Sequence, residues 1–180
     1  MYEQLPLSKR KLDIVLIAFF MVNFFFITYV VDIEQIIIKD PNNFTYPLWP
    51  PAFLVNLVHW WGKNFDPVLM ARPVWWKVTI WWDSLIFGPF YAVAIYAYAK
   101  GKEWIRIPSI IWATLMLAGV AVILAEEMWG AYATPRRDIV LPANAGWVIF
   151  PLYVLIRMSF CEHPFSKKIT DKSPSLEGRG

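Results

Sequence analysis

Long apolar stretches and short polar segments alternate along the chain. Four stretches are almost continuously hydrophobic, at about residues 12–38, 74–99, 107–129 and 143–160. A helix needs about 20 residues to cross a hydrocarbon core of about 30 Å, and only helices or closed barrels satisfy the backbone in lipid. None of the stretches alternates as a strand does. The pattern therefore predicts an all-α integral membrane protein, a bundle of four transmembrane helices.

The composition agrees with a membrane protein and excludes other classes. Of the 180 residues, 58% are hydrophobic and 17% charged, whereas about 25% of a soluble domain is charged. Eleven tryptophans suit the membrane interface, where an indole ring sits half in water. The formal charge of +3 is too small and too scattered for a nucleic-acid partner. The single cysteine, Cys161, excludes an internal disulfide.

The basic residues predict how the bundle is oriented. Lysine and arginine cluster in residues 9–11, 100–106 and 157–179, which an even number of spans places on one side. The opposite side has scattered basic residues in the long loop and the pair Arg136–Arg137, which counts against the assignment. Basic loops favour the cytoplasm. We therefore expect both termini to be cytoplasmic.

Two segments outside the spans differ from ordinary loops. Residues 39–73 are rich in proline yet contain several large apolar residues, a pattern that predicts a short amphipathic helix lying on the membrane or capping the bundle. We assign residues 1–165 to one transmembrane domain. Residues 166–180 are polar and expected to form a mobile tail, and its last six residues resemble a cloning remnant.

Acidic residues inside the spans are the first candidates for function. A carboxylate at membrane depth costs at least about 2.5–3.5 kcal/mol, so each one needs a reason. Asp83 lies near the middle of the second stretch, and Phe87 and Phe90 follow it on the same predicted helix face. This spacing predicts a carboxyl group that faces an aromatic-lined pocket. The alternative is a hydrogen bond that only joins two helices.

Other candidates lie at the helix ends and near the predicted kink. Pro89 follows Gly88 and should kink the second helix, a structural role that opens space beside the acid. Asp32 lies towards the far end of the first stretch, one turn after Thr28, where a solvated helix-end charge is the alternative. Glu126 and its neighbour Glu127 close the third stretch. We take Glu126 as the inward-facing candidate and expect at least one of the two to be solvated at the interface.

The fourth stretch and the long loop add weaker candidates. Asn144 and Trp147 are three residues apart on one helix face, and a tryptophan beside buried acids can stabilise a cation, although packing alone also explains it. Asp66 precedes Pro67, which favours a structural turn. His59 and His163 have no further ligand at metal-site spacing, so we predict no metal.

Several motifs together resemble one known family. The first span ends in Thr28-x-x-x-Asp32, and the second contains Asp83. The other matching segments are Asn64-Phe65-Asp66-Pro67-Val68-Leu69, Trp75-Trp76-Lys77, Tyr96-Ala97-Tyr98-Ala99-Lys100-Gly101 and Trp104-Ile105-Arg106-Ile107-Pro108-Ser109-Ile110-Ile111. In order and spacing they resemble the EXPERA-domain family, which includes the sigma-2 receptor and the emopamil-binding protein, a sterol isomerase. The resemblance implies four helices around a hydrophobic pocket, residence in the endoplasmic reticulum, a homodimer, and sterols or cationic amphiphiles as ligands.

The resemblance also implies roles for individual residues. Carboxylates at the positions of Asp32 and Asp83 face the pocket, and the isomerase's matching asparagine and tryptophan, here Asn144 and Trp147, line the site. The isomerase has a histidine where this chain has Thr28, and a glutamate where it has Asp83. Both departures count against sterol double-bond isomerisation and leave open proton transfer on another polycyclic or terpenoid lipid.

Two functions from different classes follow. In the first, the protein is a cofactor-independent isomerase, in which one acid protonates a buried alkene or strained ring, Trp147 stabilises the cation, and the other carboxylate removes a proton. In the second, it is a non-catalytic binding or lipid-trafficking protein, in which Asp32 or Asp83 is the counter-ion of an amine. Both hypotheses require a hydrophobic small molecule as partner: a sterol, a terpenoid or a cationic amphiphile.

Overall fold

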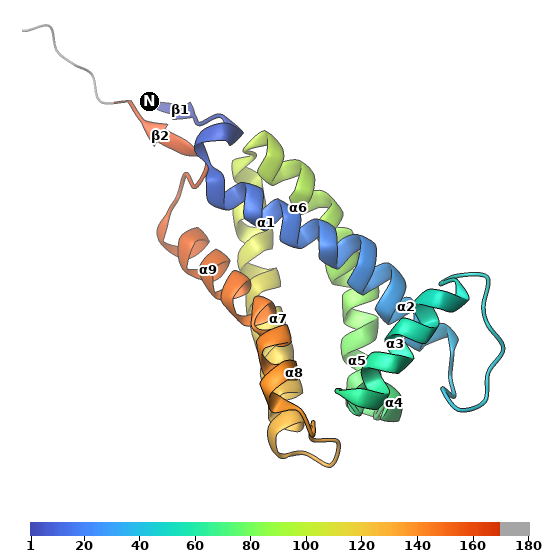
Figure 1. Ribbon diagram of the computed structural model, residues 1–180. Helices are drawn as coiled ribbons and strands as arrows, with labels where there is room; N and C mark the ends of the chain where they lie inside the picture. The colour runs from blue at the N-terminus through green and yellow to red at the C-terminus, as the bar shows by residue number, and fades with distance from the viewer. Residues whose placement is uncertain (170–180) are drawn as a thin grey trace, which may run out of the picture.

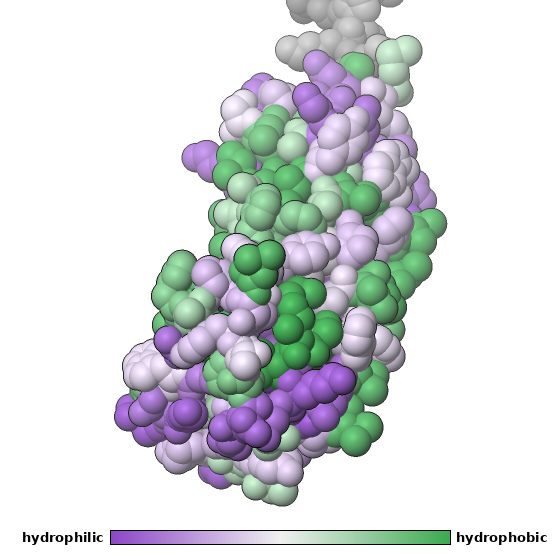
Figure 2. Space-filling view, turned by 90° about the vertical axis from the view of Figure 1, so that its right-hand side faces the viewer, coloured by the Kyte–Doolittle hydropathy of each residue, from purple (hydrophilic) through white to green (hydrophobic). Residues whose placement is uncertain are grey.

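The computed structural model describes residues 1–169 and contains four helical spans. They are Lys11–Ile37, Val74–Lys100, Glu103–Trp129 and Arg137–Phe160, each long and apolar enough to cross a membrane. Polar side chains gather mostly near the two ends of the molecule, and apolar side chains dominate between them (Figure 2). The predicted all-α bundle of four transmembrane helices is confirmed.

The first two spans are each made of three helical segments. The first span contains α1 (Lys11–Val22), a π-helical segment (Asn23–Asp32) and α2 (Ile33–Ile37). The second span contains α5 (Val74–Trp82), a second π-helical segment (Asp83–Phe87) and α6 (Gly88–Lys100). Each π-helical segment therefore lies between two α-helical segments of its span.

The remaining elements complete the bundle and its two ends. The third span is a 3-10 turn (Glu103–Ile105) followed by α7 (Arg106–Trp129), and the fourth is α8 (Arg137–Asn144) followed by α9 (Gly146–Phe160). The long loop holds α3 (Ala52–Asn64) and α4 (Val68–Ala71). A 3-10 turn (Leu7–Lys9) and two short strands, β1 (Tyr2–Gln4) and β2 (Ser166–Lys168), lie at the other end.

Aromatic packing holds the half of the bundle nearer the termini together. Helix α1 packs along α6, and α7 packs along α9 (Figure 1). Phe20 from α1 is fully buried between Tyr91 of α6 and Trp112 of α7, with ring centroids 6.0 and 5.3 Å away. Phe90 stacks on the same Trp112 at 5.2 Å and 13°. This core occupies the space that a cavity would need, so any pocket must lie nearer the loop end.

Each of the two π-helical segments carries one acid, and the second one ends beside Gly88 and Pro89. In the second span, Pro89 has no N–H to donate to the preceding turn, and the widened segment ends just before Gly88. A Cβ atom on Gly88 would lie 2.8 Å from Thr28 Cγ2, so glycine permits the two spans to approach closely here. Short π-helical segments are frequent at functional sites. Each of these carries one acid, Asp32 at the end of the first and Asp83 at the start of the second.

Helix α3 is the amphipathic helix expected in the long loop. Its inner face buries Val55 and Val58, and its outer face exposes Phe53 and Trp60. It lies across the ends of α2 and α5 (Figure 1). Of the two placements predicted for this helix, capping the bundle is therefore the one observed.

The fourth span begins earlier than predicted, because packing of α8 keeps its first residues helical. The predicted span began at about residue 143, directly after Pro142. The chain is nevertheless helical from Arg137, and the interruption lies at Ala145 between α8 and α9. The fully buried Val140 anchors α8 against the rest of the protein and outweighs the poor helix propensity of proline.

A buried ionic cluster joins the ends of three spans beside the strands. Arg10 Nη1 lies 2.5 Å from Asp13 Oδ2 and donates to the carbonyl of Tyr98 at 2.8 Å, while Arg157 pairs with the same Asp13. Next to this cluster, β1 and β2 pair antiparallel, which places the two ends of the described chain on one side. A strand at residues 166–168 was not anticipated. The cloning-like end of the predicted tail lies outside the described residues.

Candidate functional site

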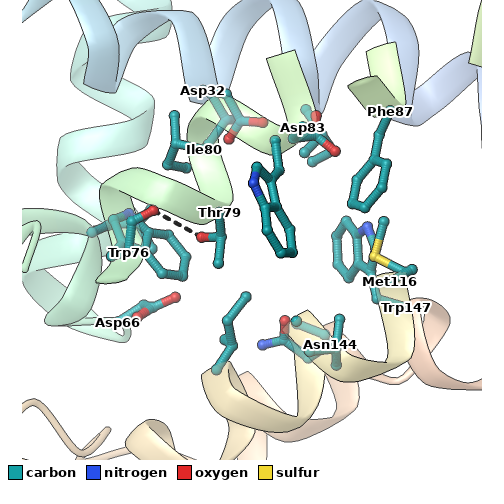
Figure 3. A pocket seen from close by; sticks show the side chains of 18 of the residues that line it. Asp32, Asp66, Trp76, Thr79, Ile80, Asp83, Phe87, Met116, Asn144 and Trp147 are labelled. Carbon is teal, nitrogen blue, oxygen red and sulfur yellow. Dashed lines mark hydrogen bonds between the residues drawn. The ribbon is translucent and has the colours of Figure 1, made fainter. Parts of the chain in front are cut away.

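A cavity of about 410 Å³ lies between the four spans and α3. Each of these elements supplies lining side chains, among them Asp32, Asp83, Met116, Trp147 and, from α3, Trp61. The wall is mainly aromatic and aliphatic, with a few polar groups that converge on the interior (Figure 3). Volume and lining are those of a site for a small hydrophobic ligand.

Asp32 and Asp83 form a carboxyl pair in the wall of the cavity. Their carboxyl groups lie next to each other, and Asp32 is only 4% exposed. Thr28 donates a hydrogen bond to Asp83 Oδ2, and the Tyr91 hydroxyl donates to Asp83 Oδ1 at 3.3 Å. When one acid of such a pair is protonated, the pair supplies a proton donor and a proton acceptor at the same place.

Two tryptophans of the wall are oriented by amides from the first span. Trp147 Nε1 donates to Asn23 Oδ1 at 2.7 Å, and Trp76 Nε1 donates to Gln35 Oε1 at 2.6 Å. Asn23 is itself fixed, because its Nδ2 donates to the carbonyl of Phe19. With both indole N–H groups engaged, the two tryptophans present ring surfaces to the cavity. Neither Asn23 nor Gln35 was predicted as a site residue, although an amide within an apolar stretch is a detectable signal.

A second polar group lines the cavity away from the Asp32–Asp83 pair. Asn144 Nδ2 donates to both carboxylate oxygens of Glu127, at 3.2 and 3.3 Å. Asp66, between α3 and α4, is 5% exposed and also lines the cavity (Figure 3). Its backbone carbonyl accepts from Leu69, so the predicted turn is present. That its carboxyl reaches the cavity was not predicted.

Two of the sequence-predicted site residues lie elsewhere. Glu126 accepts a hydrogen bond from the Tyr132 backbone at 2.7 Å and borders a shallow outer groove, so the inward-facing acid of the pair is Glu127. Phe87 lines the cavity, but Phe90 packs in the aromatic core instead. The helical-face argument failed for Phe90 because the π-helical segment after Asp83 changes the number of residues per turn.

An ionic cluster that the sequence did not reveal fastens the loop end of the cavity. Glu34 is fully buried, and Arg72 Nη2 donates to both of its carboxylate oxygens at 2.9 Å. His59 Nε2 lies 2.8 Å from Glu34 Oε1. Arg72 also donates to the carbonyl of Ile38. The cluster ties the wall helix α3 and the residue after α4 to the end of the first span, two residues beyond Asp32.

The pKa of Asp66 provides a measurable signature of its burial. Burial raises the pKa of this carboxyl from 3.8 to about 6, against the opposing effect of a hydrogen bond from the Val68 backbone. The folded protein therefore binds an extra proton between pH 4 and 6, and this contribution to stability is lost as the pH rises through about 6. A shift of this size corresponds to about 3 kcal/mol.

We therefore expect the substitution Asp66→Asn to remove part of the pH dependence of unfolding. The free energy of unfolding of the variant, relative to that of the unmodified protein, should increase by about 3 kcal/mol between pH 4 and 7. Thermal unfolding in detergent over this pH range measures it. Asp40→Asn, an exposed acid of the same long loop, is the matched control. Equal pH profiles for the Asp66 variant and the unmodified protein would contradict the prediction.

The fold and the cavity together define an integral membrane protein with a ligand-sized pocket inside its helical bundle. The family model EXPERA (EXPanded EBP superfamily) matches residues 53–158, and the chain belongs to this superfamily. The match runs from α3 to the fourth span and includes Asp83, Asn144 and Trp147; Asp32 lies before it.

Individual relatives extend the similarity to most of the chain. "Sigma intracellular receptor 2" of Homo sapiens is 30% identical over 167 residues, covering 85% of this chain and 90% of the relative. The protein of the same name from Macaca fascicularis is 29% identical over the same shares of both chains. The one from Xenopus tropicalis is 29% identical over 123 residues, 61% of this chain and 71% of the relative.

Proposed function

We propose that the protein is a cofactor-independent isomerase that moves a proton within a hydrophobic, sterol- or terpenoid-like substrate inside the membrane. The observation that carries the proposal is the pair of adjacent acids, Asp32 and Asp83, in the wall of an aromatic cavity. General acid–base catalysis needs a proton donor and a proton acceptor within reach of the reacting atoms. A carboxyl pair that shares one proton supplies both.

The chemistry follows from the positions of these groups. The protonated acid of the pair gives its proton to one carbon of an alkene, or to a strained ring, and leaves a carbocation. The face of Trp147, held by Asn23, stabilises this cation through its ring electrons. A carboxylate of the pair then takes a proton from a neighbouring carbon, so the double bond moves and no atom is gained or lost. Thr28 and Tyr91 keep Asp83 oriented throughout.

A second function is supported by different observations. The relatives named above are receptors by name, and Thr28 stands where the isomerase that this family contains has a histidine. In this alternative the protein binds sterols or cationic amphiphiles without changing them. The Asp32–Asp83 pair is then the counter-ion of an amine, and the aromatic lining supplies most of the affinity.

Incubation in deuterated water distinguishes the two functions. Purified protein is mixed with a panel of sterols and cyclic terpenoids, and the lipids are analysed by mass spectrometry. An isomerase should form a product that carries deuterium on carbon and that is absent without protein. A ligand that copurifies and exchanges no hydrogen for deuterium on carbon would overturn the isomerase and favour the binding protein.

The cellular setting is a further part of the proposal. The basic residues near β1, β2 and the loop between α6 and α7 favour this end of the bundle as the cytoplasmic one. The family resemblance suggests the endoplasmic reticulum and a homodimer. Protease protection of tagged termini in microsomes, together with the mass of the detergent-solubilised particle, tests these expectations.

A further inference from the structure

The proposed chemistry uses one group of polar side chains in the cavity and leaves another unexplained. Asp66, Glu127 and Asn144 line the same cavity as the Asp32–Asp83 pair but come from the long loop, α7 and α8. In Figure 3, Asp66 and Asn144 lie on the opposite side of the cavity from Asp32 and Asp83. Two buried acids at a second place need a reason of their own, because each costs several kcal/mol to bury.

The hydrogen bonds of this second group are incomplete. Among residues 1–169, Asp66 Oδ1 is buried and has no hydrogen-bond partner. The two oxygens of Glu127 share a single donor, Asn144 Nδ2, although a carboxylate accepts up to about four hydrogen bonds. The Asp66 and Glu127 carboxyls also lie close enough to repel each other when ionised. A purely structural cluster would be expected to satisfy these acceptors.

The same group offers no free donor to a ligand. Asn144 Nδ2 donates to Glu127 and also to the carbonyl of Val140 at 3.0 Å. The indole N–H of Trp76, which also lines the cavity, is taken by Gln35. A ketone, ester or ether oxygen would therefore find acceptors opposite it, whereas a hydroxyl or ammonium group would find partners.

We propose that the Asp66–Glu127 side of the cavity is a second polar subsite, which accepts a hydrogen-bond donor from the ligand. The ligand is then an elongated hydrophobic molecule with a polar group at each end, one at the Asp32–Asp83 pair and a hydroxyl or ammonium at Asp66 and Glu127. This inference rests on the proposed function for the first end. The second subsite would favour ligands whose far end carries a hydrogen-bond donor, a preference that the Asp32–Asp83 pair alone does not produce.

Three matched amines test the second subsite. Alkylamines of one chain length carry a terminal hydroxyl, methoxy or methyl group, and their binding to purified protein in detergent is measured by calorimetry. The hydroxyl compound should bind about tenfold more tightly than the methoxy compound, because only the hydroxyl donates to a carboxylate. Equal affinities of the hydroxyl and methoxy compounds would overturn the proposal.

Substitutions then locate the effect. In Asp66→Leu and in Glu127→Leu, the hydroxyl preference should fall below about threefold, while the methyl compound keeps its affinity and so reports an intact cavity. Glu126→Leu is the matched control, since its neighbouring carboxyl binds Tyr132 outside the cavity. A preference that survives both cavity substitutions would overturn the second subsite.

The first end is tested separately with the same compounds. Asp83→Asn should weaken all three amines alike and leave the hydroxyl preference in place. If no amine binds the unmodified protein, the two-ended ligand is overturned, while the deuterium experiment still decides the isomerase proposal separately. Binding of all three amines without a hydroxyl preference removes only the second subsite.

Discussion

Replacing Asp83 by asparagine is expected to lower turnover by about 10²–10⁴-fold, the range that a positioned general acid or base contributes. The substitution keeps the size of the side chain and one of the two oxygens that accept hydrogen bonds from Thr28 and Tyr91. It removes the shared proton, because an amide beside Asp32 neither gives nor takes a proton at neutral pH. The loss should therefore appear in turnover and not in folding. Deuterium incorporation, normalised to folded protein, measures it.

The companion substitutions sharpen this expectation. Asp32→Asn should cause a similar loss, and the double variant should be little worse than either single one, since residues that act as a unit are not additive. Glu126→Gln, an acid outside the cavity, should retain full turnover. Product formation by Asp83→Asn at the unmodified rate would remove the proton-transfer mechanism. Equal losses in all variants, including Glu126→Gln, would indicate a general defect.

The architecture was largely predictable, because lipid leaves few choices. Length and hydropathy located the first three spans to within a few residues, and the capping helix of the long loop was indicated by its apolar pattern. The fourth span was predicted too short, because charged residues and Pro142 interrupt the apolar run before residue 143, whereas tertiary packing of Val140 keeps α8 helical. Propensity is a weak guide wherever packing decides.

Site residues were predictable where burying a single charged side chain in the membrane has a clear energetic cost. Asp32 and Asp83 were singled out because a carboxylate at membrane depth is expensive, and both line the cavity. Phe90 was misplaced because no sequence pattern marked the π-helical segment. Glu126 was chosen wrongly over Glu127, because two adjacent acids at the end of a helix do not show from sequence which of them faces inward. Asp66 was assigned a purely structural role, because an aspartate before a proline in a loop is typical of a turn.

The cluster of Glu34, His59 and Arg72 could not be predicted, since its members are brought together only by the path of the loop. It has the largest expected effect on stability. Arg72→Leu should lower the free energy of unfolding by about 3–5 kcal/mol, because the fully buried Glu34 would lose its bidentate partner. Thermal or denaturant unfolding in detergent measures the loss. Arg136→Leu, which breaks the exposed pair with Asp138, should change stability little, because water and salt screen an exposed ion pair.

Two further variants separate charge from backbone. Arg72 has φ 48°, a left-handed conformation that costs a non-glycine residue about 1–2 kcal/mol, so Arg72→Gly should be less harmful than Arg72→Leu. The double variant Glu34→Leu with Arg72→Leu should recover part of the loss, because no unpaired charge remains buried. If Arg72→Leu lowers the free energy of unfolding no more than Arg136→Leu does, the cluster does not hold α3 in place. If the loss is large, the position of α3, which contributes Trp61 to the cavity wall, depends on an ionic contact two residues from Asp32. Ligand affinity should then fall together with stability.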